Sequence, residues 1–208
     1  MGYSDRTIVY YSANRENPEF ERRITEALVQ NSNGIPIISV TQKPMDLGLN
    51  ICVGDIGHCD ENIPKQLFVG AAEAKTKWII WCEADVLYPP DFFEFTPPTT
   101  TQAYRTNNLW VISKNGSLAS YKGTSDCAQI TEREFLLRRL SLVIVGKEKA
   151  GIVPMRTWVE FTTQPTINIK TGNGLRPRTR TSKAVEPVAE LPYWGNIVEL
   201  KEKYGVNL

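Results

Sequence analysis

The sequence predicts an α/β fold in which helices flank a mostly parallel sheet with a small antiparallel extension. Strand and helix patterns alternate over the first half of the chain, as repeated β-α units do. Residues 78–82 form an apolar run without alternation, which is typical of a strand covered on both faces. After Asp85 the pattern changes to short runs and an Asn-Gly step, which indicates a hairpin.

The first half contains three more expected strands and two expected helices. β-branched and aromatic residues predict strands at 7–11, 35–40 and 50–53. Asn17 is expected to cap a helix that starts at Pro18 and stops near Gly34. A second helix is expected over 62–74, with Pro64 in its first turn. Such units predict a parallel sheet with right-handed connections.

The second half begins with an expected antiparallel pair. Its strands, 109–112 and 118–121, would be joined at Asn115-Gly116. A third helix is expected over 132–145, with Thr131 as its cap and Glu134 completing a capping box. The last part of the chain shows no clear element. We expect one domain over 1–208.

Bulk composition favours an ordinary globular protein. Of 208 residues, 41% are hydrophobic and 23% are charged, and the net charge of +1 gives no overall attraction to nucleic acid or anionic membrane. No leader or membrane span is expected, so we expect a cytoplasmic location. The four cysteines lack paired spacing and are expected to be reduced and mostly buried.

Two carboxylates end the apolar run. Glu83 and Asp85 are separated by one residue, so an extended backbone points both to the same side. Ligands of open parallel sheets bind beyond the carboxyl ends of the strands. Oxygen ligands suit Mn²⁺ or Mg²⁺, which would offset charge on a departing diphosphate. Isolated acid pairs are common in solvated loops. The position of this pair, at the end of the apolar run, is therefore what indicates a metal site.

Three segments together resemble the GT-A (Rossmann-like) glycosyltransferases, particularly small family-2-like members. They are residues 10–14 (Tyr-Tyr-Ser-Ala-Asn), 66–74, and 82–89 (Cys-Glu-Ala-Asp-Val-Leu-Tyr-Pro). The resemblance covers roughly residues 7–145. It implies a nucleotide-binding half over about 1–90, and an acceptor-side half with a C-terminal lid over about 91–208. It also implies transfer of a sugar from a nucleotide-sugar donor, expected to be a UDP-sugar, to an acceptor hydroxyl.

The resemblance also implies site residues. By this likeness Asp85 binds the metal directly, and Glu83 contacts the ribose or a metal-bound water. Residues expected to contact the nucleotide sugar are Tyr11, Ser12, Asn14, Gln66, Glu83, Asp85, Lys170 and Arg176. Family members often supply a C-terminal histidine to the metal, but the comparable stretch 169–174 has none. Water would complete the shell, or Lys170 would replace part of the metal's charge, or metal dependence would be weak.

A base is needed if the reaction inverts the anomeric carbon. The resemblance points to Asp126 first and Glu132 second. The alternatives are a turn or cap role for Asp126 and a solvated helix face for Glu132, and a retaining enzyme needs no such base. His58, the only histidine, is expected to be a polar loop residue without a catalytic role.

The segment 170–183 contains five basic residues and no acidic residue. They are Lys170, Arg176, Arg178, Arg180 and Lys183. Three interpretations stay open. The segment is a lid that closes on the diphosphate, a strip that contacts a nucleic-acid acceptor such as DNA with a flipped base, or a solvated loop.

Two alternatives to a glycosyltransferase remain. A nucleotidyltransferase shares the sheet and the carboxylates, but usually has a glycine-rich basic loop after its first strand, which residues 12–17 do not form. A nucleic-acid-binding module would act through 170–183, although the near-neutral total charge argues against that as the whole function.

Overall fold

The computed structural model describes residues 5–147, 158–176 and 179–206, and it confirms the predicted fold class. Within these residues the main sheet has seven strands in the order β10-β6-β9-β4-β1-β2-β3. Their bounds are β1 (Arg6–Ser12), β2 (Ile37–Thr41), β3 (Leu49–Cys52), β4 (Trp78–Glu83), β6 (Ala103–Thr106), β9 (Gln129–Glu132) and β10 (Trp158–Phe161). β9 is antiparallel to both of its neighbours, β4 and β6, whereas the other neighbouring strands are parallel.

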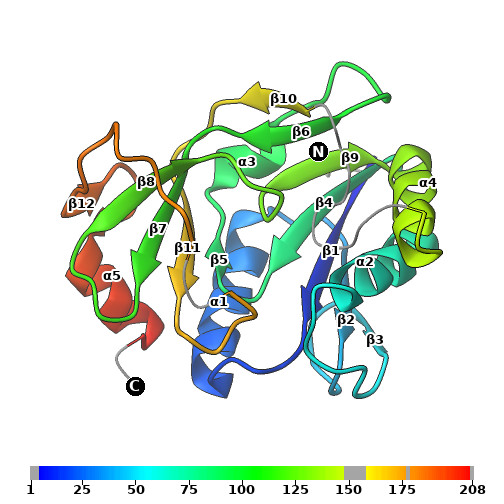
Figure 1. The fold of residues 1–208 in the computed structure, drawn as a ribbon, viewed down its shortest axis with the longest axis horizontal. Helices are drawn as coiled ribbons and strands as arrows, with labels where there is room; N and C mark the ends of the chain where they lie inside the picture. Colours follow the sequence, from blue (N-terminus) through cyan, green and yellow to red (C-terminus); the bar gives the residue numbers. More distant parts are fainter. Residues whose placement is uncertain (1–4, 148–157, 177–178, 207–208) are drawn as a thin grey trace.

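A second sheet lies beside the first in Figure 1 and contains the predicted hairpin. Its order is β5 (Val86–Leu87), β11 (Thr166–Lys170), β7 (Leu109–Ser113) and β8 (Ala119–Gly123). β5 follows β4 after a two-residue turn, so the chain passes directly from one sheet into the other. β12 (Glu190–Leu191) and β13 (Gly195–Asn196) form a further short pair.

Five helices complete the described part of the chain. They are α1 (Pro18–Asn31), α2 (Asn62–Glu73), α3 (Pro90–Glu94), α4 (Arg133–Ile144) and α5 (Ile197–Tyr204). α2 and α4 pack together on one side of the main sheet, and α1 lies on the other side near β5 and α5 (Figure 1). None of these helices has the length and apolarity that a membrane span requires.

Alternating side chains of β1 hold the two helix layers in place. Val9 packs in one core cluster with Leu67 of α2, whereas Ile8 and Tyr10 pack in another with Leu28 of α1. Neighbouring strand residues point to opposite faces, so an unbroken apolar strand fills both cores. This arrangement covers both faces of β1 and leaves its carboxyl end for ligands.

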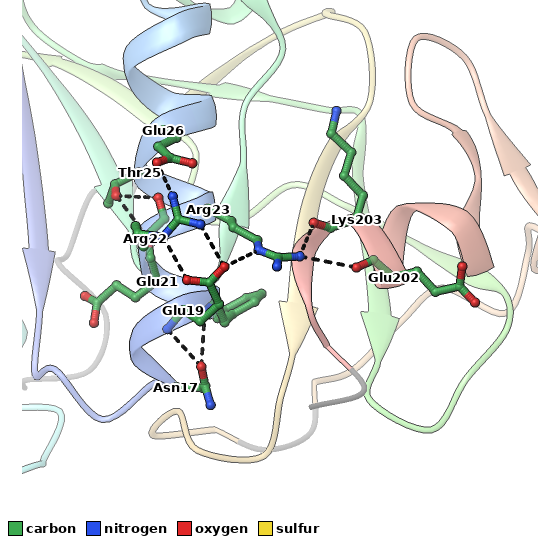
Figure 2. A network of polar contacts seen from close by, with 10 residues as sticks. Asn17, Glu19, Glu21, Arg22, Arg23, Thr25, Glu26, Glu202 and Lys203 are labelled. Carbon is green, nitrogen blue, oxygen red and sulfur yellow. Dashed lines mark hydrogen bonds and ion pairs between the residues drawn. The ribbon is translucent and has the colours of Figure 1, made fainter.

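Helix α1 is fixed at both its start and its side, as Figure 2 shows. Asn17 caps it as predicted, accepting hydrogen bonds from the backbone N–H groups of Glu19 (2.9 Å) and Phe20 (3.2 Å). Arg23 donates to the Glu19 carboxylate at 2.8 Å and to the backbone oxygen of Lys203 at 2.7 Å. A cation thus meets a carbonyl at the C-terminal end of α5, where the helix dipole favours it.

The start of α4 differs from the prediction. The cap is Glu132, whose carboxylate accepts from the Phe135 N–H at 2.6 Å. Thr131 belongs instead to β9, where it pairs with Ile79 of β4. Glu134 contacts the neighbouring Arg133 and closes no capping box. The strand therefore continues through the position expected to be the cap.

Two other expectations need correction. The C-terminal part contains β11 and α5, so it is not without regular elements. All four thiols are free as expected, but only Cys82 and Cys127 are buried, whereas Cys52 and Cys59 are exposed. Both exposed cysteines lie at or beyond the ends of short elements, where the sheet no longer covers them.

The close packing of α2 on β1 depends on a glycine. A Cβ at Gly70 would lie 2.4 Å from Cγ1 of Val9. Val9 is fully buried, and its β-branched side chain has little rotational freedom. We expect Gly70→Ala to lower the free energy of unfolding by about 1 to 3 kcal/mol, although alanine is the better helix former.

Urea unfolding measures this difference. The control is Glu73→Ala, an exposed position on the same helix, which should stay within about 0.5 kcal/mol of the unmutated chain. A Gly70→Ala chain as stable as the original would show that the helix does not depend on this contact.

Candidate functional site

A cavity opens where β1 and β4 end, the edge at which the strand order predicts ligand binding. Its walls come from the loop after β1, the loop and first turn of α2, the end of β8 with its following loop, and the end of β11 with the residues after it. All predicted site residues line it except Asn14 and Glu132. They are Tyr11, Ser12, Gln66, Glu83, Asp85, Asp126, Lys170 and Arg176.

Glu83, the last residue of β4, is held by two tyrosines. The Tyr11 hydroxyl donates to the Glu83 carboxylate. The backbone N–H of Glu83 donates to the Tyr88 hydroxyl at 3.0 Å. Tyr88 in turn donates to the backbone oxygen of Cys127 at 2.6 Å. Burial and then the nearby Asp85 raise the pKa of Glu83 from its ordinary 4.5 to about 7. This carboxyl group therefore changes charge near neutral pH.

Asp85 joins the two sheets. Its backbone oxygen accepts from the Ile169 N–H of β11 at 2.7 Å. One carboxylate oxygen accepts from the Asn168 side-chain amide at 3.0 Å, and the other from the Lys170 ammonium at 3.1 Å. Asn168 and Lys170 are two residues apart on β11 and so point to the same side. Lys170 was expected from the sequence, but Asn168 was not, because the pattern of residues 166–170 did not predict a strand.

Lys170 keeps its charge in this position. Burial alone would lower the pKa of its ammonium, but the carboxylates of Asp85 and Glu83 outweigh that effect, and the pKa is raised. The ion pair with Asp85 is largely shielded, with the two side chains 14% and 12% exposed. A fixed positive charge thus lies in the cavity beside the two carboxylates.

These residues do not fit a preformed site for Mn²⁺ or Mg²⁺. Both Asp85 oxygens are already hydrogen-bonded, one of them by a cation. Two unit charges about 4 Å apart interact with about 4 kcal/mol near a protein surface, and a divalent ion doubles that repulsion. Among the residues that the structure describes, no group of three His, Cys, Asp or Glu could hold a metal. The metal expected from the resemblance stays a prediction.

Glu16 is a further residue of the cavity lining, and it was not expected from the sequence. It lies in the loop between β1 and α1, and its carboxylate accepts from the Thr171 hydroxyl at 2.6 Å. A Cβ on Gly174 would lie within 4 Å of both Glu16 and Asp85, so all three meet at one point. Burial raises the pKa of Glu16, and Asp85 adds to the rise. No local pattern reveals Glu16, because its partner is far away in sequence.

The expected nucleotide-side residues have different positions. Ser12 lines the cavity at the end of β1. The Gln66 amide donates to the backbone oxygens of Ser12 (2.9 Å) and Val40 (2.8 Å), which fixes the ends of β1 and β2. Asn14 faces away, and its side-chain oxygen accepts from the N–H groups of Gln42 (3.0 Å) and Lys43 (2.9 Å). Asn14 therefore orders the loop without bordering the cavity.

Only some basic residues of the segment 170–183 line the cavity. Arg176 lines it and donates to both carboxylate oxygens of Asp60, each at 3.1 Å. Arg180 and Lys183 are exposed and lie outside the lining, and Arg178 lies outside the described residues. His58 lies on the cavity wall next to this contact. The 171–176 stretch thus spans from the Glu16 loop to the loop before α2.

The two candidate bases lie at different ends of β9. Asp126 lines the cavity and accepts from the Ser125 hydroxyl at 3.1 Å, and the Lys122 ammonium donates to that hydroxyl at 2.9 Å. Glu132 pairs with Trp78 at the start of β4, the end remote from the cavity, and caps α4. This position does not fit the catalytic role expected for Glu132.

Comparison with solved structures identifies the fold. The inositol-1-phosphate CTP transferase from T. maritima is 12% identical with a TM-score of 0.53, over 98% of this chain and 97% of that chain. S. aureus TarS is 8% identical with a TM-score of 0.51, over 79% of this chain and 36% of that chain. The chain therefore has a GT-A-like fold. At these identities the likeness concerns the fold alone.

A third similar structure is a glycosyltransferase involved in the glycosylation of the major capsid of PBCV-1. It is 11% identical with a TM-score of 0.45, over 76% of this chain and 81% of that chain. No protein-family model and no curated protein sequence matches the chain.

The raised pKa of Glu83 predicts a pH-dependent stability. The folded chain keeps this proton up to about pH 7, whereas the unfolded chain releases it near the ordinary value of 4.5. The folded state binds more protons between these values, so the contribution of Glu83 to stability falls as pH rises through them. Glu83→Gln carries no charge and should be more stable than the unmutated chain above pH 7, by at most about 3 kcal/mol.

Urea unfolding at about pH 4.5 and about pH 8 measures the gap, which is the difference in free energy of unfolding between Glu83→Gln and the unmutated chain. The gap should vanish at the lower pH, where both side chains are neutral. Glu134→Gln, on the exposed face of α4, should show no pH-dependent gap. A Glu83→Gln gap of the same size at both pH values contradicts the raised pKa.

Proposed function

We propose that the chain is a glycosyltransferase, similar to small family-2-like members, that moves a sugar from a nucleotide-sugar donor to an acceptor hydroxyl. The observation that carries the proposal is the pair Glu83 and Asp85 at the end of β4, facing Lys170 and Arg176 in one cavity. Carboxylates at this edge can hold ribose hydroxyls, and cations can hold a diphosphate. A UDP-sugar is the proposed donor.

The loop after β1 favours glycosyl transfer over nucleotidyl transfer. Nucleotidyl transfer needs a cradle of backbone N–H groups for a triphosphate, which glycine-rich loops supply. Here the Asn14 N–H is already bonded to the Ser12 hydroxyl at 2.9 Å. The loop also places the Glu16 carboxylate on the cavity wall, where it would repel a triphosphate.

Asp126 is the proposed base for an inverting reaction. It would take the proton of the acceptor hydroxyl while that oxygen bonds to the anomeric carbon. The bond between this carbon and the diphosphate oxygen breaks, and its electron pair leaves with the nucleoside diphosphate. Lys122 and Ser125 hold the carboxylate in orientation through their hydrogen bonds.

The acceptor remains a separate proposal. The basic segment led us to expect a nucleic-acid acceptor, such as a DNA base, or a nucleic-acid-binding module. Arg180 and Lys183 are exposed and could contact phosphates outside the cavity. Both expectations stay predictions.

Donor binding is the first test. Nucleotide sugars should raise the thermal unfolding midpoint of the chain, because a ligand that binds only the folded state stabilises it. We expect one donor, a UDP-sugar, to shift the midpoint more than the others in a panel. Asp85→Ala should abolish sugar transfer, while any binding of DNA should survive. If no donor shifts the midpoint, or if Asp85→Ala transfers at full rate, the proposal is wrong.

Asp126 is tested through the rate of the chemical step. We expect Asp126→Asn to lower kcat by about 10²- to 10⁴-fold with little change in donor affinity, because only the proton transfer is lost. The readout is release of nucleoside diphosphate from the bound donor, with and without acceptor. Glu132→Gln is the matched control and should leave kcat unchanged. Equal rates for Asp126→Asn and the unmutated chain rule out this base.

A further inference from the structure

The cavity holds a fixed ammonium at the point where the resemblance expects a divalent metal. We propose that Lys170 takes the place of that metal, so that the chain binds the diphosphate of its donor without Mn²⁺ or Mg²⁺. The inference rests on the proposed function, because it concerns the same diphosphate. It replaces a dissociable cofactor with a residue of the chain itself.

Asp85 already carries a cation. One of its carboxylate oxygens accepts from the Asn168 amide and the other from the Lys170 ammonium, so a metal ion bound there would meet a positive charge on the same carboxylate. The lysine is not a surface side chain that happens to lie nearby. It is the last residue of β11, which pairs with β7 along its whole length and with β5 next to Asp85.

Three carboxylates lie near the Lys170 ammonium. Glu16, Glu83 and Asp85 all lie close enough to affect this ammonium or one another electrostatically. The Lys170 ammonium lies among these carboxylates and donates a hydrogen bond to Asp85.

The Lys170 ammonium can donate further hydrogen bonds. An ammonium has three donors, and in the structure Lys170 uses one of them for Asp85. The other two can reach phosphate oxygens in the same cavity. When the sugar bond breaks, negative charge grows on the departing diphosphate oxygen, and the ammonium stabilises it there without any change in the number of bound ions.

Lys170 also accounts for the absence of a histidine in the stretch 169–174, where members of the resembled family often supply a histidine to the metal. The comparable stretch begins with Ile169 and Lys170 and then turns through Thr171, whose hydroxyl binds Glu16. The chain thus uses this segment to bring a cation and to close the loop after β1. A histidine ligand would have no metal to bind beside that ammonium.

The experiment compares binding of nucleoside diphosphates with and without metal. UDP, GDP, ADP, CDP and TDP are titrated into the unmutated chain by calorimetry, once in EDTA and once in Mn²⁺. We expect at least one of them to bind with affinities that agree within about two-fold. Lys170→Met should weaken that binding about ten- to hundred-fold in EDTA, the loss expected for a charge-assisted contact.

Lys183→Met is the control, because Lys183 is an exposed lysine outside the cavity. The affinity of this variant for the nucleoside diphosphate should equal that of the unmutated chain. Thermal unfolding checks that Lys170→Met is folded, and the EDTA comparison on the unmutated chain does not depend on that variant. Binding that needs Mn²⁺ overturns the inference and leaves the proposed function intact. If none of the five binds under either condition, both fail.

Discussion

The ion pair between Asp85 and Lys170 is the interaction on which the site depends, because it joins the two sheets. Asp85 lies in the turn between β4 of the main sheet and β5 of the second sheet. Lys170 comes from β11, which pairs with β5. The cavity is therefore complete only when the second sheet has docked. Such a site cannot form from residues 1–90 alone, although Glu83 and Asp85 lie in that segment.

The same turn explains why the carboxylates are placed so closely. Tyr11 and Tyr88 fix Glu83 at its side chain and at its backbone, and Ile169 fixes the backbone of Asp85. Neither acid can move away from the other to reduce their repulsion. Burial of Glu83, and then this repulsion, raise its pKa, so the carboxyl group holds a proton. The fixed position of the two acids thus contributes to their altered charge state.

The cavity edge formed by β4 could be predicted because it depends on local pattern. An apolar run that ends in two acids specifies both a buried strand and its ligand edge, and Asn17-Pro18 specifies where α1 begins. β11 could not be found in this way. Its alternation of Ile167 and Ile169 with polar residues was the available signal, but it is only five residues long and lies among glycines and prolines.

Long-range contacts account for the other differences between the expected site and the structure. Glu16 belongs to the site only because Thr171 closes on it. Asp126 and Glu132 are six positions apart, and an extended chain of that length spans roughly 20 Å. The sequence offered both as candidates for one role, Asp126 first and Glu132 second. The antiparallel strand β9 between them instead carries one to the cavity and the other to the start of α4.

Charge balance relates these observations to the choice of substrate. The lining of the cavity has five acids and four Lys or Arg residues within the described chain. The acids are Glu16, Asp60, Glu83, Asp85 and Asp126, and the bases are Arg15, Lys122, Lys170 and Arg176. Such a lining has little positive charge to spare, since Arg176 is already paired with Asp60. The diphosphate of a nucleotide sugar is a smaller anionic load than a triphosphate, which supports the proposed glycosyl transfer over nucleotidyl transfer.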